Sequence, residues 1–429
     1  QEPNRAIITS KWGEIETAEV KKDTQVRYLG GVKSPILTEV KKSDKVTVLE
    51  DEDDWMKVAT ADGYVGYIKT KFLKNQKKEK ISRDFTEPVY SNMTEDHSIN
   101  MAWHNVTNVA ANNAVQQVLA STSGLTTIAP TWFSLADTEG NISSIADADY
   151  VNYAHTAGLE VWAVFRDFHG GTNSYDETYE TLRYTSKRAK LEDQVVAAAV
   201  AAGVDGINLD FELISSKCGV HYVQLVRELS VKCHQNNLVF SVDNYVPQSY
   251  NSHYDLKEQG IVADYVVIMA YDEHTEGSYE AGSVASISYL QDGIEKTLKK
   301  VSADKVIAGI PFFTRLWFET AKSPEQLSEE AGTEAASYPN KVSSKALGME
   351  EAAQSVVNAG ATAQWDEKTQ QNYAKWSADG GTYRIWLEDA QSLEAKLKVI
   401  QGNKLAGVAE WSLGREESSV WKLISQYVN

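Results

Sequence analysis

Cysteine is scarce in this chain: its 429 residues include two, Cys218 and Cys233. They flank residues 220–234, which we predict to form one helix, and about 15 residues at a rise of about 1.5 Å would separate its ends by roughly 22 Å. Because a disulfide needs Cα atoms within about 7 Å of each other, we expect two free thiols. Cysteine and histidine are also not spaced as in a metal site, so we expect neither a metal nor another cofactor.

A long apolar run is missing as well. The most apolar stretch, residues 195–204, is about half as long as a membrane-spanning helix must be. We therefore expect no membrane span in this chain. The sequence opens at Gln1, without a charged leader followed by an apolar segment, so we expect that any signal or anchor has been removed, and export stays open.

Positive charge is in deficit. Lys and Arg number 42 against 60 Asp and Glu, for a formal net charge of −18. This excess of acids argues against binding to nucleic acid or to an anionic membrane surface. A neutral partner fits better, and we take a monomer as the expected state. At this length we expect two or three domains, with enough residues for a large core.

The first part of the chain, residues 1–75, predicts a small all-β module, because apolar and polar residues alternate in short runs such as residues 45–49 and 64–68. Residues 55–68 resemble the bacterial SH3-like domains that are common in cell-wall proteins. The charged run that begins at Lys74 has no apolar periodicity, so we predict a linker over residues 76–84.

Beyond residue 85 the pattern changes to apolar strands that alternate with helical stretches. Near-continuous apolar strands separated by helices are typical of a parallel sheet, and eight of them over this length favour a closed (β/α)8 TIM barrel spanning residues 85–429. The gap before the last strand is too long for one helix, so we predict a small α+β insertion over residues 317–386. The predicted strands cover residues 98–103, 126–130, 160–165, 206–211, 238–242, 265–270, 306–310 and 406–411.

The fourth predicted strand carries a polar row. Side chains alternate between the two faces of a strand, so Asn208, Asp210 and Glu212 share one face while the apolar residues between them share the other. Burying two carboxylates is costly unless they are paired or used. A buried ion-pair row is the alternative, but the strand holds no Lys or Arg. Chemistry is therefore the favoured interpretation.

In a barrel of this kind the active site lies at the carboxyl ends of the strands, where Glu212 falls. Burial and the like charge of Asp210 should push Glu212 toward its protonated form, which suits a general acid that protonates a leaving-group oxygen. Asp210 would stay ionised and orient the substrate. Hydrolysis of a glycosidic bond needs such an acid and a group that stabilises the oxocarbenium-like transition state.

The run from Asp205 to Glu212 resembles the Asp-x-x-Asp-x-Asp-x-Glu signature of glycoside hydrolase family 18. Residues 269–274 after the sixth strand and Trp411 in the eighth extend the likeness over residues 85–429. Residues 271–274, 346–349 and 386–389 resemble the subgroup that includes spore-cortex-lytic N-acetylglucosaminidases and other bacterial wall enzymes. The family resemblance implies a glycosidase that works by substrate-assisted retention.

The resemblance also implies roles for single residues. Glu212 would protonate the glycosidic oxygen while the acetamido carbonyl of the substrate attacks the anomeric carbon. Asp210 would hold the acetamido N–H, and Tyr271 would donate to the acetamido oxygen. Trp411 would form the floor beneath the distorted sugar, and Asp272 would contact sugar hydroxyls.

Further residues are predicted at the substrate with alternatives left open. Met269 shares a face with Tyr271 and could equally fill the barrel. Trp132, like Trp103 and Trp317, lies near a strand end and could stack on a sugar or pack in the core. Asn208 stands where the family has an acid, so it can bind by hydrogen bonds but cannot titrate, which should alter the pH profile.

We therefore expect a secreted hydrolase of β-1,4-linked N-acetylglucosamine in cell-wall or spore-cortex peptidoglycan, located outside the cell or in the wall, with the N-terminal module as a targeting or spacing domain. Chitin or chitooligosaccharides are the alternative substrates. A glycan-binding protein without turnover is the alternative of another class. The sequence leaves open endo or exo cleavage and the ligand of the N-terminal module.

Overall fold

The computed structural model describes residues 13–81 and 91–428 of the chain. It divides into two compact units, Gln1–Val89 and Tyr90–Asn429. Each unit has its own hydrophobic core. The predictions made for residues 1–12 and 82–84 lie outside the described residues.

The N-terminal unit is a seven-stranded antiparallel sheet with the order β3-β2-β6-β5-β4-β1-β7. One side chain in two points inward along these strands, and valines such as Val26 and Val58 are fully buried in the core. The strands are β1 (Gly13–Val20), β2 (Thr24–Arg27), β3 (Ile36–Val40), β4 (Lys45–Glu52), β5 (Trp55–Ala59), β6 (Val65–Lys69) and β7 (Leu73–Ile81).

The prediction of a linker over residues 76–84 is wrong in its first part. Residues up to Ile81 belong to β7, which lies at the edge of this sheet. Its lysines face glutamates of β1 in register: Lys78 pairs with Glu16 and Lys74 with Glu19. Opposite charges across a strand pair stabilise it, and a charged edge strand needs no apolar period. That is why the run looked like a linker.

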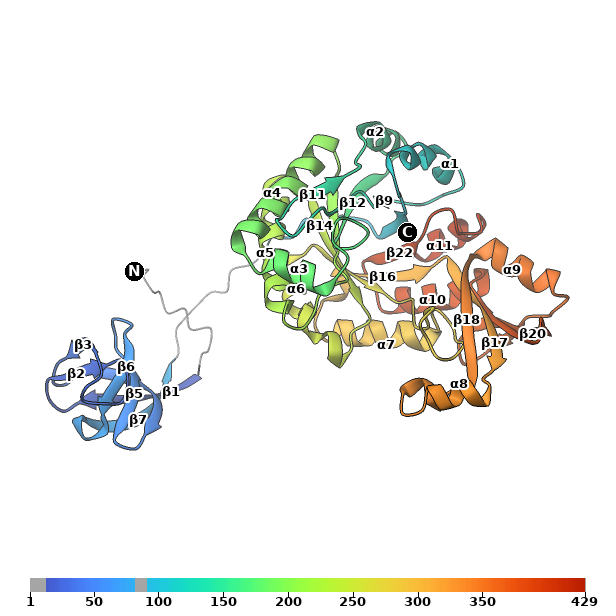
Figure 1. Cartoon of the computed structure of the whole chain (residues 1–429). Helices are drawn as coiled ribbons and strands as arrows, with labels where there is room; N and C mark the ends of the chain where they lie inside the picture. The colour runs from blue at the N-terminus through green and yellow to red at the C-terminus, as the bar shows by residue number, and fades with distance from the viewer. Residues whose placement is uncertain (1–12, 82–90, 429) are drawn as a thin grey trace. The chain divides into compact units, whose positions relative to one another are not determined.

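The second unit contains the predicted closed barrel of eight parallel strands, with the helices around its outside (Figure 1). The last strand pairs with the first, which closes the barrel. The strands are β8 (Ile99–His104), β9 (Thr127–Pro130), β12 (Glu160–Arg166), β13 (Gly206–Asp210), β14 (Val239–Tyr245), β15 (Tyr265–Met269), β16 (Val306–Pro311) and β22 (Gly407–Trp411), and a short hairpin of β10 (Phe133–Leu135) and β11 (Ile142–Ser144) extends the sheet beside β12.

Two apolar layers result from the alternation along the barrel strands. Ile207 and Leu209 of β13 pack outward in the large cluster between strands and helices, whereas Trp162 and Val164 of β12 belong to the cluster inside the barrel. The helices are α1 (Val115–Leu119), α2 (Ala148–Thr156), α3 (Tyr175–Leu182), α4 (Thr185–Ala202), α5 (Gly219–Gln235), α6 (Leu256–Val262), α7 (Ile287–Leu298), α10 (Ala390–Gly402) and α11 (Val420–Val428). Cys218 and Cys233, at the two ends of α5, are free and buried.

A five-stranded antiparallel sheet is inserted between β16 and β22, with the order β18-β17-β21-β20-β19 (Figure 1). It begins at Phe313, slightly before the predicted residue 317, because β17 follows β16 almost directly. Its elements are β17 (Phe313–Ala321), α8 (Pro324–Glu329), β18 (Asn340–Gly348), α9 (Met349–Asn358), β19 (Gln364–Asp366), β20 (Gln371–Ala378) and β21 (Gly381–Leu387).

Candidate active site

The polar row of β13 points into the mouth of the barrel. Asn208 and Asp210 are buried, and Glu212 follows two residues beyond at the carboxyl end of the strand, where it is partly exposed. The neighbouring Leu209 and Phe211 pack in the outer core. The alternation predicted from the sequence is therefore confirmed, and it sets both carboxyl groups at the end of the barrel where active sites of this fold lie.

Asn208 links three strands. Its Oδ1 accepts from Trp103 Nε1 at 3.0 Å, and its Nδ2 donates to Ser241 Oγ at 2.9 Å and to Asp243 Oδ1 at 2.7 Å. The side chain is fully buried and both amide hydrogens are used. The prediction that Asn208 contacts substrate is therefore wrong; the residue anchors Asp243.

Asp210 is 7% exposed, and its Oδ1 is buried without a hydrogen-bond partner. Burial raises the pKa of Asp210 well above its usual range, and the charges of Glu212, Asp243 and Asp167 raise it further, while Arg166 opposes them. These surroundings make the carboxylate form of Asp210 costly, and an ionised Asp210 beside a protonated Glu212 stays a prediction.

Arg166 supplies a positive charge that the fourth strand lacks. It pairs in register with Asp210 on the neighbouring strand β12 and lies on the same face as the inward-facing Val164. Its Nε is buried and has no hydrogen-bond partner. The guanidinium can therefore attract a carboxylate across the mouth without being tied to one.

Glu212 is held from both neighbouring strands. Its backbone N–H donates to Asp167 Oδ1 at 2.9 Å, and that of Leu213 donates to Asp167 Oδ2 at 3.0 Å. Tyr245 donates from its hydroxyl to Glu212 Oε2. Burial raises the pKa of Glu212, the bond from Tyr245 lowers it, and the charge of Asp272 raises it. A fixed carboxyl group with a raised pKa suits proton transfer to and from a bound ligand.

Asp167 is itself fully buried, and burial raises its pKa to about 7 despite the N–H groups that donate to it. It therefore acts on the site through the backbone that carries Glu212.

Four residues of the site were not predicted from the sequence: Arg166, Asp167, Asp243 and Tyr245. Each lies at the end of β12 or β14, the two strands that flank β13. Because the carboxyl ends of parallel strands meet at one edge, the polar residues at those ends were the signal that could have found them.

Tyr271 lies beside the acids, 8% exposed, with its ring edge-on to Trp103 at 6.4 Å and to Phe313 at 6.3 Å between centroids. Gly309 of β16 gives this ring its room, because a Cβ there would lie 3.3 Å from the ring and 2.9 Å from a backbone oxygen. Burial, followed by the charge of Asp210, raises the pKa of Tyr271, so its hydroxyl stays a donor.

Of the other residues predicted to bind substrate, some lie at the rim of the barrel mouth and one lies inside the barrel. Trp411 is partly exposed and lies against Trp103 with 6.0 Å between ring centroids. Asp272 is exposed and has a left-handed backbone, with φ of 58°. Met269 is 7% exposed and belongs to the cluster inside the barrel. Trp411 and Asp272 can thus reach a ligand directly, whereas Met269 lies mainly beneath the site.

Trp132 does not line the site. It is 2% exposed, packs in the outer core edge-on to Tyr150, and donates from Nε1 to Asn112 Oδ1 at 2.8 Å. The prediction that it contacts substrate is therefore wrong. Trp103 and Trp317 are buried as well. Position near a strand end does not separate a sugar platform from a core indole, because both bury a large apolar ring.

Other polar residues of the motif region are structural. Asp205, at the amino end of β13, accepts from the Val161 N–H at 2.8 Å and contacts His155 Nε2 at 2.8 Å, so it braces that end of the barrel. His104 contacts the Tyr150 hydroxyl at 2.9 Å, and burial lowers its pKa to about 4. Among the described residues no group of three or more His, Cys, Asp and Glu could hold a metal ion, and no helix there is long and apolar enough to cross a membrane.

The family profile "Glycosyl hydrolases family 18" matches residues 102–416, which include the whole mouth described above. The chain belongs to glycoside hydrolase family 18. It is therefore a glycosidase by family. Asp210 and Glu212 lie at the carboxyl end of its fourth barrel strand. A second profile, "Bacterial SH3 domain", matches residues 21–74 and so confirms the predicted N-terminal module.

Curated relatives of this family 18 chain include two glycosylases or lytic enzymes of Bacillus subtilis. The chain is 26% identical over 295 residues to "Uncharacterized glycosylase YvbX" of Bacillus subtilis, covering 66% of this chain and 80% of that protein. It is 27% identical over 256 residues to the "Cortical fragment-lytic enzyme" of the same organism, covering 57% of this chain but 54% of that protein. The match thus spans little more than half of the second relative.

Solved structures share the fold. The spore cortex-lytic enzyme SleL of Bacillus megaterium superposes with a TM-score of 0.64 at 20% identity, covering 82% of this chain and 77% of that one. A chitinase from Chromobacterium violaceum gives 0.64 at 20% identity, covering 77% and 98%. At these identities the likeness establishes the barrel of this family 18 chain and leaves its substrate open.

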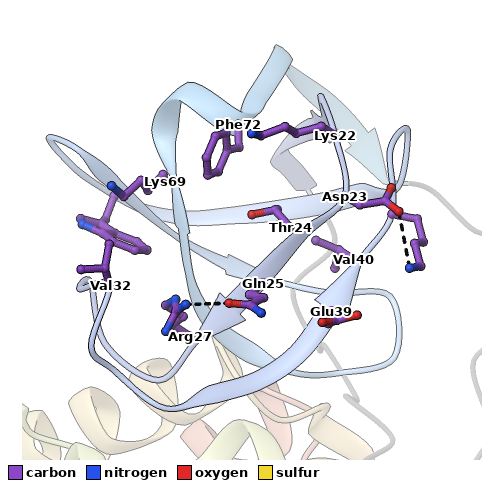
Figure 2. Close-up of a pocket in the computed structure, with 12 residues that line it drawn as sticks. Lys22, Asp23, Thr24, Gln25, Arg27, Val32, Glu39, Val40, Lys69 and Phe72 are labelled. Carbon is purple, nitrogen blue, oxygen red and sulfur yellow. Dashed lines mark hydrogen bonds and ion pairs between the residues drawn. The ribbon is translucent and has the colours of Figure 1, made fainter.

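The SH3-like unit has a hollow of its own, of about 400 Å³. Figure 2 shows its wall: Lys69 and Phe72 lie along one side and Gln25 and Arg27 along another. Lys22 lies over the Phe72 ring at 4.4 Å, and Arg27 donates to the Ser34 carbonyl at 2.7 Å. The wall carries both signs of charge, since Asp23 and Glu39 line it together with Lys22 and Lys69.

Proposed function

We propose that this protein is a secreted hydrolase that cleaves β-1,4-linked N-acetylglucosamine in cell-wall or spore-cortex peptidoglycan, with retention of configuration. The observation that carries the proposal is Glu212, a half-buried acid fixed by Asp167 and Tyr245 beside the buried Asp210. Relatives named for cortex lysis favour peptidoglycan as the substrate class.

In the proposed reaction Glu212 gives its proton to the glycosidic oxygen while the acetamido carbonyl of the substrate attacks the anomeric carbon. The bond to the leaving sugar breaks, and an oxazolinium ion forms. Asp210 holds the acetamido N–H and balances the positive charge, and Tyr271 donates to the acetamido oxygen. Glu212, now a carboxylate, then takes a proton from the water that opens the ring.

The rim residues would bind the sugar. Trp411, partly exposed beside Trp103, offers an apolar floor beneath the distorted ring. Asp272 is exposed at the same mouth and close enough to Glu212 to raise its pKa, so it is placed to accept from sugar hydroxyls. Met269 would support this floor from below.

A chitinase is the second candidate, favoured by the likeness of the barrel to chitinase structures. A binding protein without turnover is the third, and the fixed position and raised pKa of Glu212 speak against it. The location outside the cell or in the wall, the monomeric state and a wall-targeting role for the hollow of the SH3-like unit belong to the same proposal.

Mass spectrometry of released products tests the proposal. The full chain would be incubated with purified vegetative peptidoglycan, cortex peptidoglycan and chitooligosaccharides. We expect fragments from peptidoglycan that end in reducing N-acetylglucosamine, and no cleavage after chemical removal of the N-acetyl groups, because the substrate then lacks its nucleophile. Products from chitooligosaccharides alone would make the enzyme a chitinase. Binding without products from any glycan would overturn the enzymatic proposal.

Tyr245→Phe should shift the alkaline side of the pH–rate profile. The hydroxyl lowers the pKa of Glu212 by donating to its carboxylate, so its removal raises that pKa. Because the acid works while protonated, activity should persist to a pH higher by about one unit, with a loss in kcat of less than about tenfold. Kinetics against pH would measure this. Tyr175→Phe is the control, an exposed neighbouring phenol; an equal shift in both variants would contradict the prediction.

A further inference from the structure

Two buried carboxyl groups lie on neighbouring strands at the mouth. β13 and β14 pair in parallel with Asn208 opposite Ser241, and the next inward-facing residues are Asp210 and Asp243. Neighbouring strands are about 4.8 Å apart, so the two side chains are adjacent. They are 7% and 2% exposed. Oδ1 of Asp210 and Oδ2 of Asp243 are both buried without a hydrogen-bond partner.

These two groups cannot both be ionised cheaply. Burial raises the pKa of Asp243 to about 8, and the charge of Asp243 adds to the burial that raises the pKa of Asp210. Two adjacent buried carboxyl groups hold one proton between them over a wide pH range. Asn208 occupies Oδ1 of Asp243 with an N–H at 2.7 Å, which leaves Oδ2 as the oxygen free to carry the shared proton.

Other charged and polar groups also act on Asp210 and Asp243. Arg166 is the cation among the groups that act on Asp210. Asn208, an uncharged donor, holds Asp243 alone of the two. The groups that interact with Asp210 or Asp243 are Arg166 and Asp167 from β12 and its end, Glu212 from the end of β13, Tyr245 from the end of β14, Tyr222 from α5, Tyr271 from the loop after β15, and Trp103 from β8.

We propose that Asp243 is a positioning residue that shares one proton with Asp210, so that Asp210 becomes the anion when its proton passes to Oδ2 of Asp243. The O–H bond on Asp210 breaks, one forms on Asp243, and the charge of the pair stays at one negative. The proton that Glu212 gives to the leaving oxygen is separate. The family signature has an acid at position 208; here the neighbouring strand supplies it. This inference rests on the proposed function.

Asp243→Asn in the full chain separates this role from a merely structural one. The amide can still accept from Asn208, so an anchoring role would survive the change. If Asp243 shares a proton, its removal ends the like-charge repulsion, and Asp210 ionises at lower pH. We expect the acidic side of the kcat profile to move down by at least about one unit, with kcat lowered about tenfold and KM changed less than about threefold.

The exchange Asn208→Asp with Asp243→Asn returns the acid to β13 and keeps the hydrogen bond between the two positions. It should bring the acidic side of the profile back toward that of the wild type. Ser241→Ala is the matched control, since it removes an acceptor of Asn208 but no charge. An unchanged profile in Asp243→Asn, or the same shift in Ser241→Ala, would overturn the inference.

Thermal unfolding against pH gives a readout that needs no activity. The folded pKa of Asp243, about 8, lies above its unfolded value, so the wild type loses stability as the pH rises toward 8. Asp243→Asn should therefore gain stability relative to the wild type between about pH 4 and pH 8. If the wild type cleaves no glycan but Asp243→Asn shows this gain, the proposed function is overturned and the shared proton is supported. If the wild type cleaves glycan but the variant shows no gain, only the shared proton is overturned.

Discussion

Glu212→Gln should lose about a thousandfold or more in kcat on peptidoglycan, with little change in binding. The amide keeps the shape of the side chain and can still accept from Tyr245, but it has no proton to give to a leaving oxygen. Burial raises the pKa of Glu212, so the wild type keeps that proton to a higher pH than an exposed glutamate does. Initial rates and isothermal titration with the same glycan would measure the two effects.

The leaving group provides the decisive comparison for this variant. A dinitrophenyl glycoside departs without help from an acid, so its first step should be far less affected than cleavage of peptidoglycan. Glu160→Gln is the matched control: this glutamate lies at the amino end of β12, and burial raises its pKa too, but it is remote from the mouth. If Glu212→Gln kept more than about a tenth of the activity, Glu212 would not be the acid.

The fold could be predicted because its signals are local and repeated. Each barrel strand is an apolar run between helical stretches, and a strand such as residues 265–269 is buried along its whole length. The strand β7 was not predicted because its signal is not local. Lys74 and Lys78 are stabilised by glutamates on β1, and no pattern within the run itself reveals those partners.

The candidate site was predictable only along one strand. Asp210 and Glu212 follow from the alternation of β13, and Tyr271 from the family resemblance. Asp243 and Tyr245 act across strands, and a single sequence does not state which side chains face each other there. The predictions for Asn208 and Trp132 failed on contacts of the same kind, because Asp243 and Asn112, distant in sequence, occupy their polar groups.

Asp210→Asn should lower kcat on peptidoglycan by about 100- to 1000-fold at neutral pH, while KM changes little, because the charge of Asp210 is needed as the oxazolinium ion forms. Burial raises the pKa of Asp210, so at low pH the wild type is itself neutral there. The ratio of wild-type to variant kcat should therefore shrink as the pH falls and grow as Asp210 ionises, which kinetics across the pH range would measure. Asp205→Asn, at the other end of β13, is the control and should alter thermal stability through its bond to Val161, with the pH dependence unchanged. A ratio that stays constant with pH would show that the charge of Asp210 is not what the reaction uses.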